Sequence, residues 1–263
     1  VSAVARHPAL LAMEISTLSQ VYNNRLIAGI GLGVPAWVRQ MGLHPPSPLA
    51  ALRECVTSTK ALLRGETLNI QGEVFSFDNV TLVYPESGTP TPVRMGALGP
   101  KMLQLSGEVG DGSVLSVSAG HDYVRWAKER IEEGRQRGGR DDAHPVTVFA
   151  IYAVDEDGDA ARASARSTLA FYRQNGSNGL TDVYGISDEL NALVKKGGYE
   201  AVLQGMPDQW VEDLTIAGSP EECAAKISAF YAAGADAVAL FPVATDRIEE
   251  VVRLTAEKVL PRL

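Results

Sequence analysis

The chain has 263 residues, of which 45% are hydrophobic, 21% charged and 6% aromatic, so it is long enough for one large core or two small ones and is unlike a disordered or fibrous protein. Its formal net charge of −8 argues against nucleic acid or an anionic membrane surface as a partner, because neither would attract it. No apolar run approaches the roughly 20 residues that a membrane helix needs, and the first residues lack the pattern of a signal peptide.

Hydrophobic periodicity predicts an alternation of strands and helices. Short apolar or β-rich runs predict strands at Leu26–Ile30, Val93–Ala97, Gly112–Val117, Val146–Val154 and Ala235–Phe241. Amphipathic runs predict helices over Pro8–Val21 (ended by Asn23-Asn24), Leu49–Leu63, Pro100–Val109, Tyr123–Arg137 and Pro220–Ala233, with a last helix opening at Asp246. The pattern also predicts a hairpin over Leu68–Phe77 and a helix-rich insertion over about 158–212.

Strand–helix alternation implies a parallel sheet with helices outside it. Five strands could form an open doubly wound sheet, whereas a complete barrel needs eight. Because the chain opens on a helix, as if the preceding strand were lost, we prefer a single TIM (β/α)8-type barrel domain over 1–263. In that architecture strands 1–3 are absent from this chain. Composition alone does not decide between the two architectures.

Two predicted strand ends carry glycines, Gly29–Gly33 and Gly96–Gly99. Ligands of parallel α/β folds bind beyond the carboxyl ends of the strands. At the second site the strand turns directly into a helix that begins at Pro100. Unpaired N–H groups at a helix start, beside two glycines, form a natural phosphate cradle. From spacing alone, a phosphate cradle and a simple tight turn are about equally favoured.

Val93–Val117 (VRMGALGPKMLQLSGEVGDGSVLSV) resembles the bacterial luciferase-like superfamily of flavin- and F420-dependent oxidoreductases. Within it, the nearest branch is the F420-dependent group that includes methylenetetrahydromethanopterin reductase. Further landmarks follow in family order: Arg6–Ala9, Asn24–Gly33, Leu62–Glu66 and Ala217–Glu222. Each landmark is weak alone, but the ordered set across the whole chain is specific.

The resemblance implies a cofactor site. By position, Gly33 and the run Gly96, Ala97, Leu98 and Gly99 match contacts to the phosphate tail of coenzyme F420. Val1 matches the end of the third barrel strand, next to a cis peptide bond that backs the deazaflavin ring in many members. The family also implies a small-molecule substrate, a homodimer, and FMN as the alternative cofactor.

The run Gly33-Val34-Pro35-Ala36-Trp37 departs from the family pattern. Members that act on sugars or pterins often carry an acidic residue here, so its absence argues against a sugar-phosphate dehydrogenase and weakens the pterin reductase interpretation. Val34-Pro35 would make a stiff apolar wall. Trp37 would offer a stacking face to a flat substrate, or would pack into the core against the next helix, which is slightly favoured.

Catalytic side chains are not evident, and His44, on the loop after a glycine-bearing strand end, is a weak candidate proton donor. We expect His7 to brace a helix start, with cofactor contact less favoured, His121 to cap the following helix, and His144 to be structural. No two histidines have metal-ligand spacing, and Asp155–Asp159 lacks the spacing and closing Glu of a calcium loop, so no metal site is expected. Cys55 and Cys223 lie far apart in helical patterns, which predicts buried thiols in a cytoplasmic protein.

Hydride transfer by a flavin or deazaflavin needs little acid–base help, because the cofactor carries the chemistry. The leading hypothesis is therefore an oxidoreductase that transfers a hydride between F420 and a small organic substrate. The first alternative is an FMN-dependent luciferase-like monooxygenase, and the second is a non-catalytic flavin-binding relative.

Overall fold

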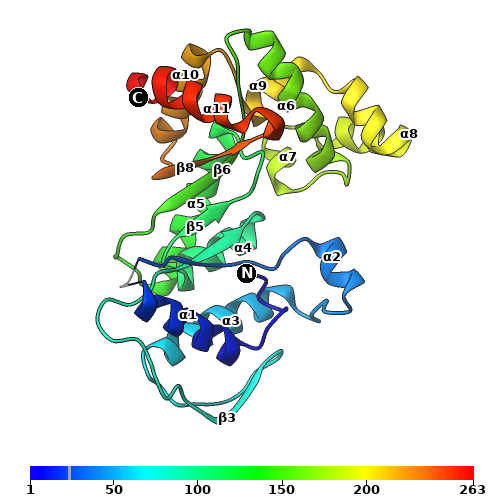
Figure 1. Cartoon of the computed structure of the whole chain (residues 1–263). Coiled ribbons are helices and arrows are strands. Elements are labelled where there is room, and N and C mark those ends of the chain that lie inside the picture. Colours follow the sequence, from blue (N-terminus) through cyan, green and yellow to red (C-terminus); the bar gives the residue numbers. More distant parts are fainter. Residues whose placement is uncertain (23–24) are drawn as a thin grey trace. The chain divides into compact units, whose positions relative to one another are not determined.

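A computed structural model describes residues 1–22 and 25–263 (Figure 1). Asn23 and Asn24, which we expected to end the first helix, lie outside the described residues. The chain forms two compact units that interleave along the sequence. Unit 1 comprises 1–97, 101–114 and 130–144, and unit 2 comprises 98–100, 115–129 and 145–263. The expected single domain stays a prediction.

Unit 1 contains short parallel strands and the helices that cover them. Its strands are β1 (Ala28–Ile30), β2 (Leu68–Gln71), β3 (Ser76–Val80), β4 (Val93–Ala97) and β5 (Ser113–Leu115), the last ending in unit 2. Its helices are α1 (Pro8–Val21), α2 (Pro35–Gln40), α3 (Pro48–Leu63) and α4 (Pro100–Val109), the last beginning in unit 2. β1 and β4 pair in parallel, β5 lies next to β4, and β2 and β3 form an antiparallel hairpin.

The helices of unit 1 begin where the sequence supplies a cap. His7 precedes α1 and its Nδ1 accepts the Ala9 N–H at 3.3 Å, which confirms that it braces this helix start. Ser47 caps α3 in the same way through the Ala50 N–H at 3.3 Å. α1 and α3 then pack side by side over β1 and β4 (Figure 1). Their buried side chains form one apolar core with Ile30 and Met95, and each such side chain stabilises the fold by roughly 1.5–3 kcal/mol.

Unit 2 contains a second parallel group of strands and most of the helices. Its strands are β6 (Val146–Val154), β7 (Ile216–Gly218) and β8 (Ala237–Pro242). Its helices are α5 (His121–Gly138, shared with unit 1), α6 (Gly158–Arg173), α7 (Gly179–Val183), α8 (Ser187–Gly205), α9 (Asp208–Leu214), α10 (Pro220–Ala232) and α11 (Ile248–Leu254). A 3₁₀ turn, Thr245–Arg247, precedes α11, and a π turn, Thr255–Val259, and a 3₁₀ turn, Leu260–Arg262, follow it.

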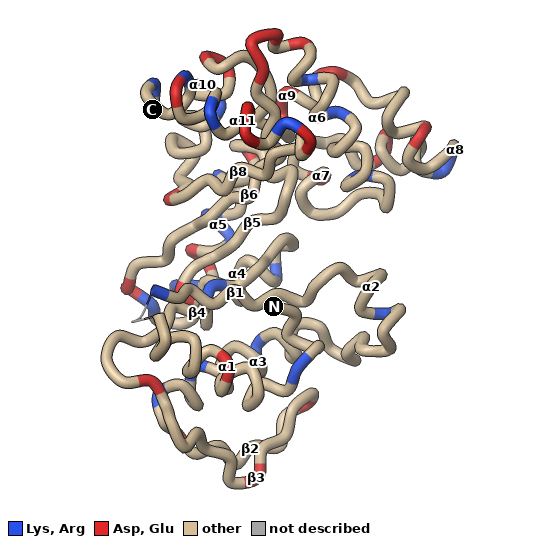
Figure 2. Tube along the Cα trace, in the orientation of Figure 1, with Lys and Arg blue, Asp and Glu red and all other residues tan. Residues whose placement is uncertain are grey.

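β6 is the central strand of unit 2. It pairs in parallel with β8 along Thr147–Tyr152 and with β7 along Tyr152–Val154, so Tyr152 pairs with both neighbouring strands. Nine uncharged, β-rich residues suit such a buried strand. Figure 2 shows that the helices of unit 2 carry charged residues, whereas β6 carries none. α10 begins with a capping box, in which Ser219 and Glu222 bind each other's backbone N–H.

The structure confirms the parallel α/β architecture and adds two elements that periodicity did not predict. α2 has only six residues and β7 only three, too few to show a period. With β7 the sheet has six strands instead of five. Closure into a barrel and three strands before Val1 stay predictions. Among the described residues, no helix is both long and apolar enough to cross a membrane.

Candidate functional site

The glycines at the ends of β1 and β4 lie against each other in unit 1. β1 and β4 run in register from Ala28↔Val93 to Ile30↔Met95, and this register brings Gly31 opposite Gly96. A Cβ added at either glycine would lie 3.5 Å from the Cα of the other, an ordinary contact distance. The strand ends therefore meet backbone to backbone, and the surface that they present there carries no side chain.

The first residues of the chain extend this row of strand ends. Ser2 forms a parallel bridge with Gly31, and the Gly31 N–H donates to the Val1 carbonyl at 3.0 Å. The Ser2 hydroxyl donates to the Leu32 carbonyl at 2.8 Å. Gly33 follows with φ +84°, a conformation that favours glycine, and a Cβ there would lie 3.4 Å from Ser2 Oγ. The structure thus brings together Val1, Gly33 and Gly96, three of the residues predicted to hold the cofactor.

Arg94 shares the glycine face of the sheet. Val93, Met95 and Ala97 are buried in alternation along β4, which leaves Arg94 and Gly96 on the opposite face. In register, Arg94 pairs with Gly29, two residues before Gly31. Arg94 is therefore a half-buried cation on the same face of β4 as Gly96. Sequence reasoning missed Arg94, although an arginine inside an otherwise apolar strand run was the available signal.

Unit 2 holds the remainder of the glycine loop, Leu98–Pro100. The Leu98 carbonyl accepts a hydrogen bond at 2.6 Å from the hydroxyl of Tyr123, a fully buried side chain of α5. Burial raises the pKa of Tyr123 far above its usual range, so the hydroxyl keeps its proton and remains a donor. A Cβ on Gly179, the first residue of α7, would lie 3.5 Å from Gly99 Cα. Contacts from two helices therefore fix the backbone of this loop.

The loop after β5 also carries unusual backbone. Ser118 has φ +72°, is fully buried, and its hydroxyl has no hydrogen-bond partner among the described residues. A Cβ at Gly120 would lie 2.0 Å from the Asp213 carbonyl oxygen and 2.1 Å from the Tyr184 hydroxyl, so only glycine fits there. Strained backbone beyond the end of a parallel strand is often found at functional sites. Sequence reasoning did not identify Ser118, because nothing in the sequence shows that a serine adopts a positive φ.

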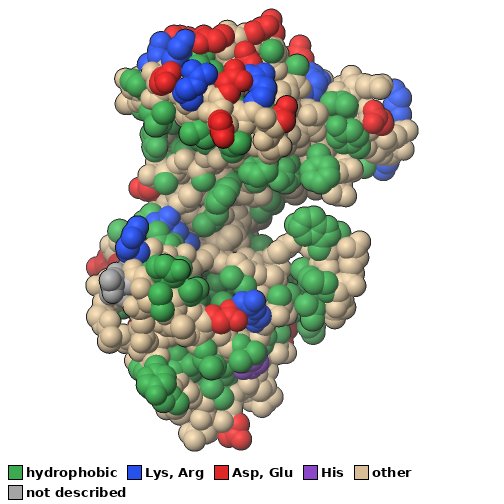
Figure 3. Space-filling model, viewed as in Figure 1, with side chains coloured by type: hydrophobic (Ala, Val, Ile, Leu, Met, Phe, Trp, Pro, Cys, Tyr) green, Lys and Arg blue, Asp and Glu red, His purple; other side chains and the backbone are tan. Residues whose placement is uncertain are grey.

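Trp37 and His44, the two candidate site residues predicted after Gly33, both lie at the surface. Trp37 on α2 is 60% exposed, which contradicts the slightly favoured prediction that it packs into the core. α2 is held instead by Val38, whose Cγ2 lies 3.4 Å from the position of a Cβ on Gly33. His44 lies exposed in the loop between α2 and α3. Figure 3 shows hydrophobic side chains gathered over α2, where Val34 and Met41 are exposed beside Trp37.

The other histidines have local roles. His144 Nε2 lies 2.9 Å from Ser113 Oγ, and burial lowers its pKa to about 4, so it is neutral and structural as predicted. His121 is the first residue of α5, and its capping role stays a prediction. Asp157 caps α6, and Asp155 pairs with Arg247 at 2.9 Å. Within the described residues, no group of three or more His, Cys, Asp or Glu side chains could hold a metal ion.

The cysteines are buried thiols, as predicted. Burial is the main reason that the pKa of Cys55 rises to about 11 and that of Cys223 to about 12. Neither thiol is therefore ionised near neutral pH, and neither suits nucleophilic chemistry.

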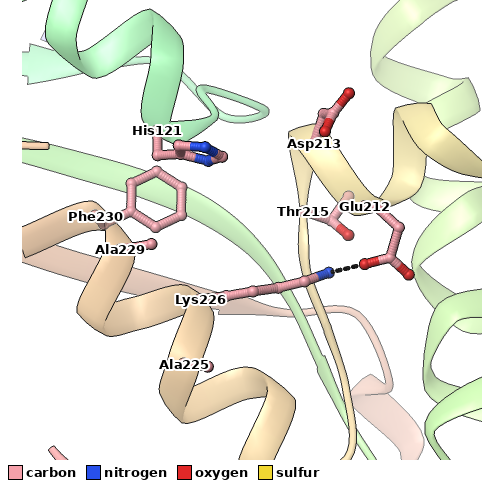
Figure 4. Close-up of a pocket in the computed structure, with 8 residues that line it drawn as sticks. All are labelled: His121, Glu212, Asp213, Thr215, Ala225, Lys226, Ala229 and Phe230. Carbon is pink, nitrogen blue, oxygen red and sulfur yellow. Dashed lines mark ion pairs between the residues drawn. The ribbon is translucent and has the colours of Figure 1, made fainter. Parts of the chain in front are cut away.

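A separate pocket of unit 2 lies between α5, α9 and α10 (Figure 4). It has a volume of about 250 Å³. Lys226 points into it and pairs with Glu212 at 2.7 Å, while its ammonium also donates to the Ala217 carbonyl at 3.0 Å. His121 and Phe230 lie on its opposite side (Figure 4). The pocket includes none of the predicted cofactor residues, and its one cation is already neutralised.

A buried arginine of unit 2, Arg173, was also missed. It ends α6 with only 4% of its surface exposed. In the sequence it looks like the usual basic residue of a last helical turn, so its burial could not be read from the pattern.

These features define a parallel α/β protein whose strand ends are built of bare backbone, a surface suited to a phosphate-bearing cofactor. Residues 1–237 match the family model of the luciferase-like monooxygenases. The chain is 30% identical to a 5,10-methylenetetrahydromethanopterin reductase of Archaeoglobus fulgidus, over 97% of this chain and 79% of that protein. It is 24% identical to an F420-dependent glucose-6-phosphate dehydrogenase of Nakamurella multipartita, over 98% of this chain and 74% of that protein.

Among solved structures, the chain is similar to the coenzyme F420-dependent tetrahydromethanopterin reductase of Methanopyrus kandleri. The TM-score is 0.82 at 25% identity, and the match covers 97% of this chain and 79% of that one. The chain therefore belongs to the luciferase-like monooxygenase family. This membership confirms the predicted family, and the structural match confirms its α/β fold.

Proposed function

We propose that the chain is an oxidoreductase that transfers a hydride between coenzyme F420 and a small organic substrate. The observation that carries the proposal is the backbone-to-backbone contact of Gly31 and Gly96, which keeps the strand ends free of side chains. Membership of a family of oxidoreductases and the F420 dependence named for its relatives support the same function.

The residues of the chain fit this cofactor. Gly99 has no atom within 4 Å of the position of a Cβ, so the space in front of its backbone is open. Gly33 and Gly96 to Gly99 would hold the phosphate tail, and Val1 would lie near the ring. When bound, F420 supplies the hydride acceptor or donor. The chain's own residues bind the tail, fix the loop through Tyr123 and keep water from the reacting atoms.

The wall after Gly33 bears on the class of substrate. Val34-Pro35-Ala36-Trp37 supplies no carboxylate, and the Trp37 side chain is exposed. A flat apolar substrate would gain contact area from the indole ring, whereas a sugar phosphate would find neither hydrogen-bond acceptor nor charge on α2 before Arg39. We therefore infer a substrate that is less polar than glucose 6-phosphate, with Trp37 as a stacking residue and His44 as a candidate proton donor.

Cofactor titrations followed by absorbance test the proposal. The purified chain should bind F420 with micromolar affinity or better and should bind FMN at least about tenfold more weakly. Tight FMN binding without F420 binding would instead favour the monooxygenase alternative. F420 binding without turnover, over a panel of small alcohols, ketones and enones, would favour the non-catalytic alternative.

The loop itself is tested by Gly99→Val. The new side chain enters open space, so folding should be unchanged, while the bulk in front of the loop should weaken F420 binding at least tenfold. Ala232→Val adds similar bulk to an exposed site near the end of α10 and should leave F420 binding unchanged. Equal affinities of the two variants would place the phosphate elsewhere.

A further inference from the structure

Arg173 is buried on the apolar side of α6. The buried residues Ala161, Ala165 and Leu169 recur at intervals of four, and Arg173 continues this series into the last turn. α6 packs against β6 and β7. The guanidinium therefore lies under the helix instead of in solvent, although its charge strongly favours water.

The other arginines of the same helix are paired. Arg162 binds Asp159 at 2.8 Å and Glu222 at 3.1 Å, and Arg166 binds the Met206 carbonyl at 2.7 Å. Arg173 has no such partner: its Nε and Nη1 are buried without a hydrogen bond among the described residues. Burial lowers its pKa to about 10, and no acidic group offsets the effect. A buried cation of this kind normally has an anion beside it.

Two contacts of residues near Arg173 in the sequence involve segments that follow or end strands. Tyr172, one residue earlier, contacts the ring of Phe241 at the end of β8, with centroids 6.4 Å apart. Six residues after Arg173, Gly179 meets the backbone of Gly99. Ligands of parallel α/β folds bind at these strand ends.

We propose that Arg173 binds an oxyanion, a phosphate or carboxylate group, of the molecule that occupies this site. Its planar guanidinium donates two parallel N–H groups to two oxygens, and the buried Nε and Nη1 supply free donors. The anion belongs either to the tail of the deazaflavin cofactor or to the substrate, and this part of the inference rests on the proposed function. The negative end of the α6 dipole carries only a partial charge and does not replace such a ligand.

Thermal unfolding of the full chain tests the anion site without any cofactor. In a buffer free of oxyanions, Arg173→Met should raise the Tm, because it removes an uncompensated buried charge and keeps most of the volume. Inorganic phosphate at tens of millimolar should raise the Tm of the wild type and have no effect on Arg173→Met. Arg173→Lys keeps the charge but loses the two parallel N–H donors, so phosphate should raise its Tm only slightly. If Arg173→Met does not fold, Arg173→Lys serves as the test variant.

Arg162→Met is the matched control on the same helix. It breaks ion pairs at the surface, so it should lower the Tm slightly and keep the full response to phosphate. A purely structural role for Arg173 predicts the opposite pattern: Arg173→Met would unfold at a lower temperature and still respond to phosphate as the wild type does. That pattern would overturn the proposal.

Binding titrations then distinguish the two sources of the anion. Loss of at least tenfold in affinity for F420 by Arg173→Met, with unchanged affinity for the deazaflavin chromophore lacking the phosphate-bearing chain, assigns the site to the cofactor tail. Unchanged affinity for both, together with the lost phosphate response, assigns it to the substrate. If the wild type binds no F420, the proposed function fails, whereas the phosphate response still decides the role of Arg173.

Discussion

Polar side chains of unit 1 that lie wholly or partly below the surface form hydrogen bonds with one another or with the backbone. The carboxylate of Glu54 on α3 accepts the N–H groups of Glu73, Val74 and Phe75 at 2.8–3.0 Å, and so holds the β2–β3 turn. Ser113 Oγ lies 2.7 Å from Ser106 Oγ and 2.9 Å from His144 Nε2. This second chain depends on the charge state of a histidine, which makes it sensitive to pH.

His144 should make the protein less stable in mild acid. Burial, aided by Arg135 and Arg140, lowers its pKa in the folded state from the ordinary 6.5 to about 4. Between these two pH values His144 is protonated in the unfolded chain but neutral in the folded chain. The free energy of unfolding therefore falls as the pH drops from 6.5 to about 4. His144→Gln keeps a hydrogen-bonding group for Ser113 and does not titrate.

Urea unfolding at pH 7.5 and pH 5 measures this effect. Carboxylates contribute equally to both proteins, so the difference between wild type and His144→Gln isolates the histidine. The wild type should lose more stability than the variant between the two pH values. Equal losses would mean that His144 is protonated in the folded state.

At the scale of elements, α4 and α5 approach closely in unit 1 through two glycines. A Cβ on Gly107 would lie 2.0 Å from the Ile131 carbonyl oxygen, and one on Gly134 would lie 1.8 Å from that of Gln104. Each glycine therefore faces the backbone of the other helix, which cannot move aside as a side chain can. The contact explains why two helical positions keep a residue with poor helix propensity.

Alanine at these positions should reverse the usual effect of a glycine-to-alanine change. Helix propensity alone would stabilise the chain by up to ~1 kcal/mol. Forcing the helices apart costs about 1–3 kcal/mol or more, so Gly107→Ala and Gly134→Ala should each lower the free energy of unfolding. Gly99→Ala, which meets no atom within 4 Å, is the control and should be close to neutral in urea unfolding. A gain in stability at Gly107 or Gly134 would contradict the close crossing.

Sequence patterns located elements well and side-chain environments poorly. β4, α4 and β6 have the predicted bounds, because Pro100 marks a helix start and Val146–Val154 is continuously β-rich. The cradle glycines were found for the same reason, since a strand that ends in glycines before a proline is a local signal. The environments of Trp37, Ser118 and Arg173 depend on which segments pack against them. These segments are distant in the sequence, so the residues next to each position do not reveal them.

At the scale of the whole molecule, exposed apolar residues on α1 stand out from a surface that carries many charges. Leu10, Met13 and Val21 recur at helical spacing and are exposed. Figure 3 shows hydrophobic side chains gathered on unit 1, and Figure 2 shows few charges along α1. Among the described residues, the ion pair of Arg6 with Glu14 is the one that involves α1. Contiguous apolar surface of this kind marks an interaction site.

A second copy of the chain is the partner that we predict for this face. The net charge of −8 works against association elsewhere on the surface, whereas α1 is nearly uncharged and an isologous contact would place apolar residues on apolar residues. Light scattering coupled to gel filtration should give about twice the 28.1 kDa of one chain at micromolar concentration.

Met13→Glu and Val21→Glu, at positions 55% and 65% exposed, should shift the protein to monomer without lowering its Tm. Val252→Glu on α11, 58% exposed, makes the same change in unit 2 and should leave the dimer intact. A wild type that stays monomeric at every concentration, or a dimer that survives both α1 changes, would rule out α1 as the interface.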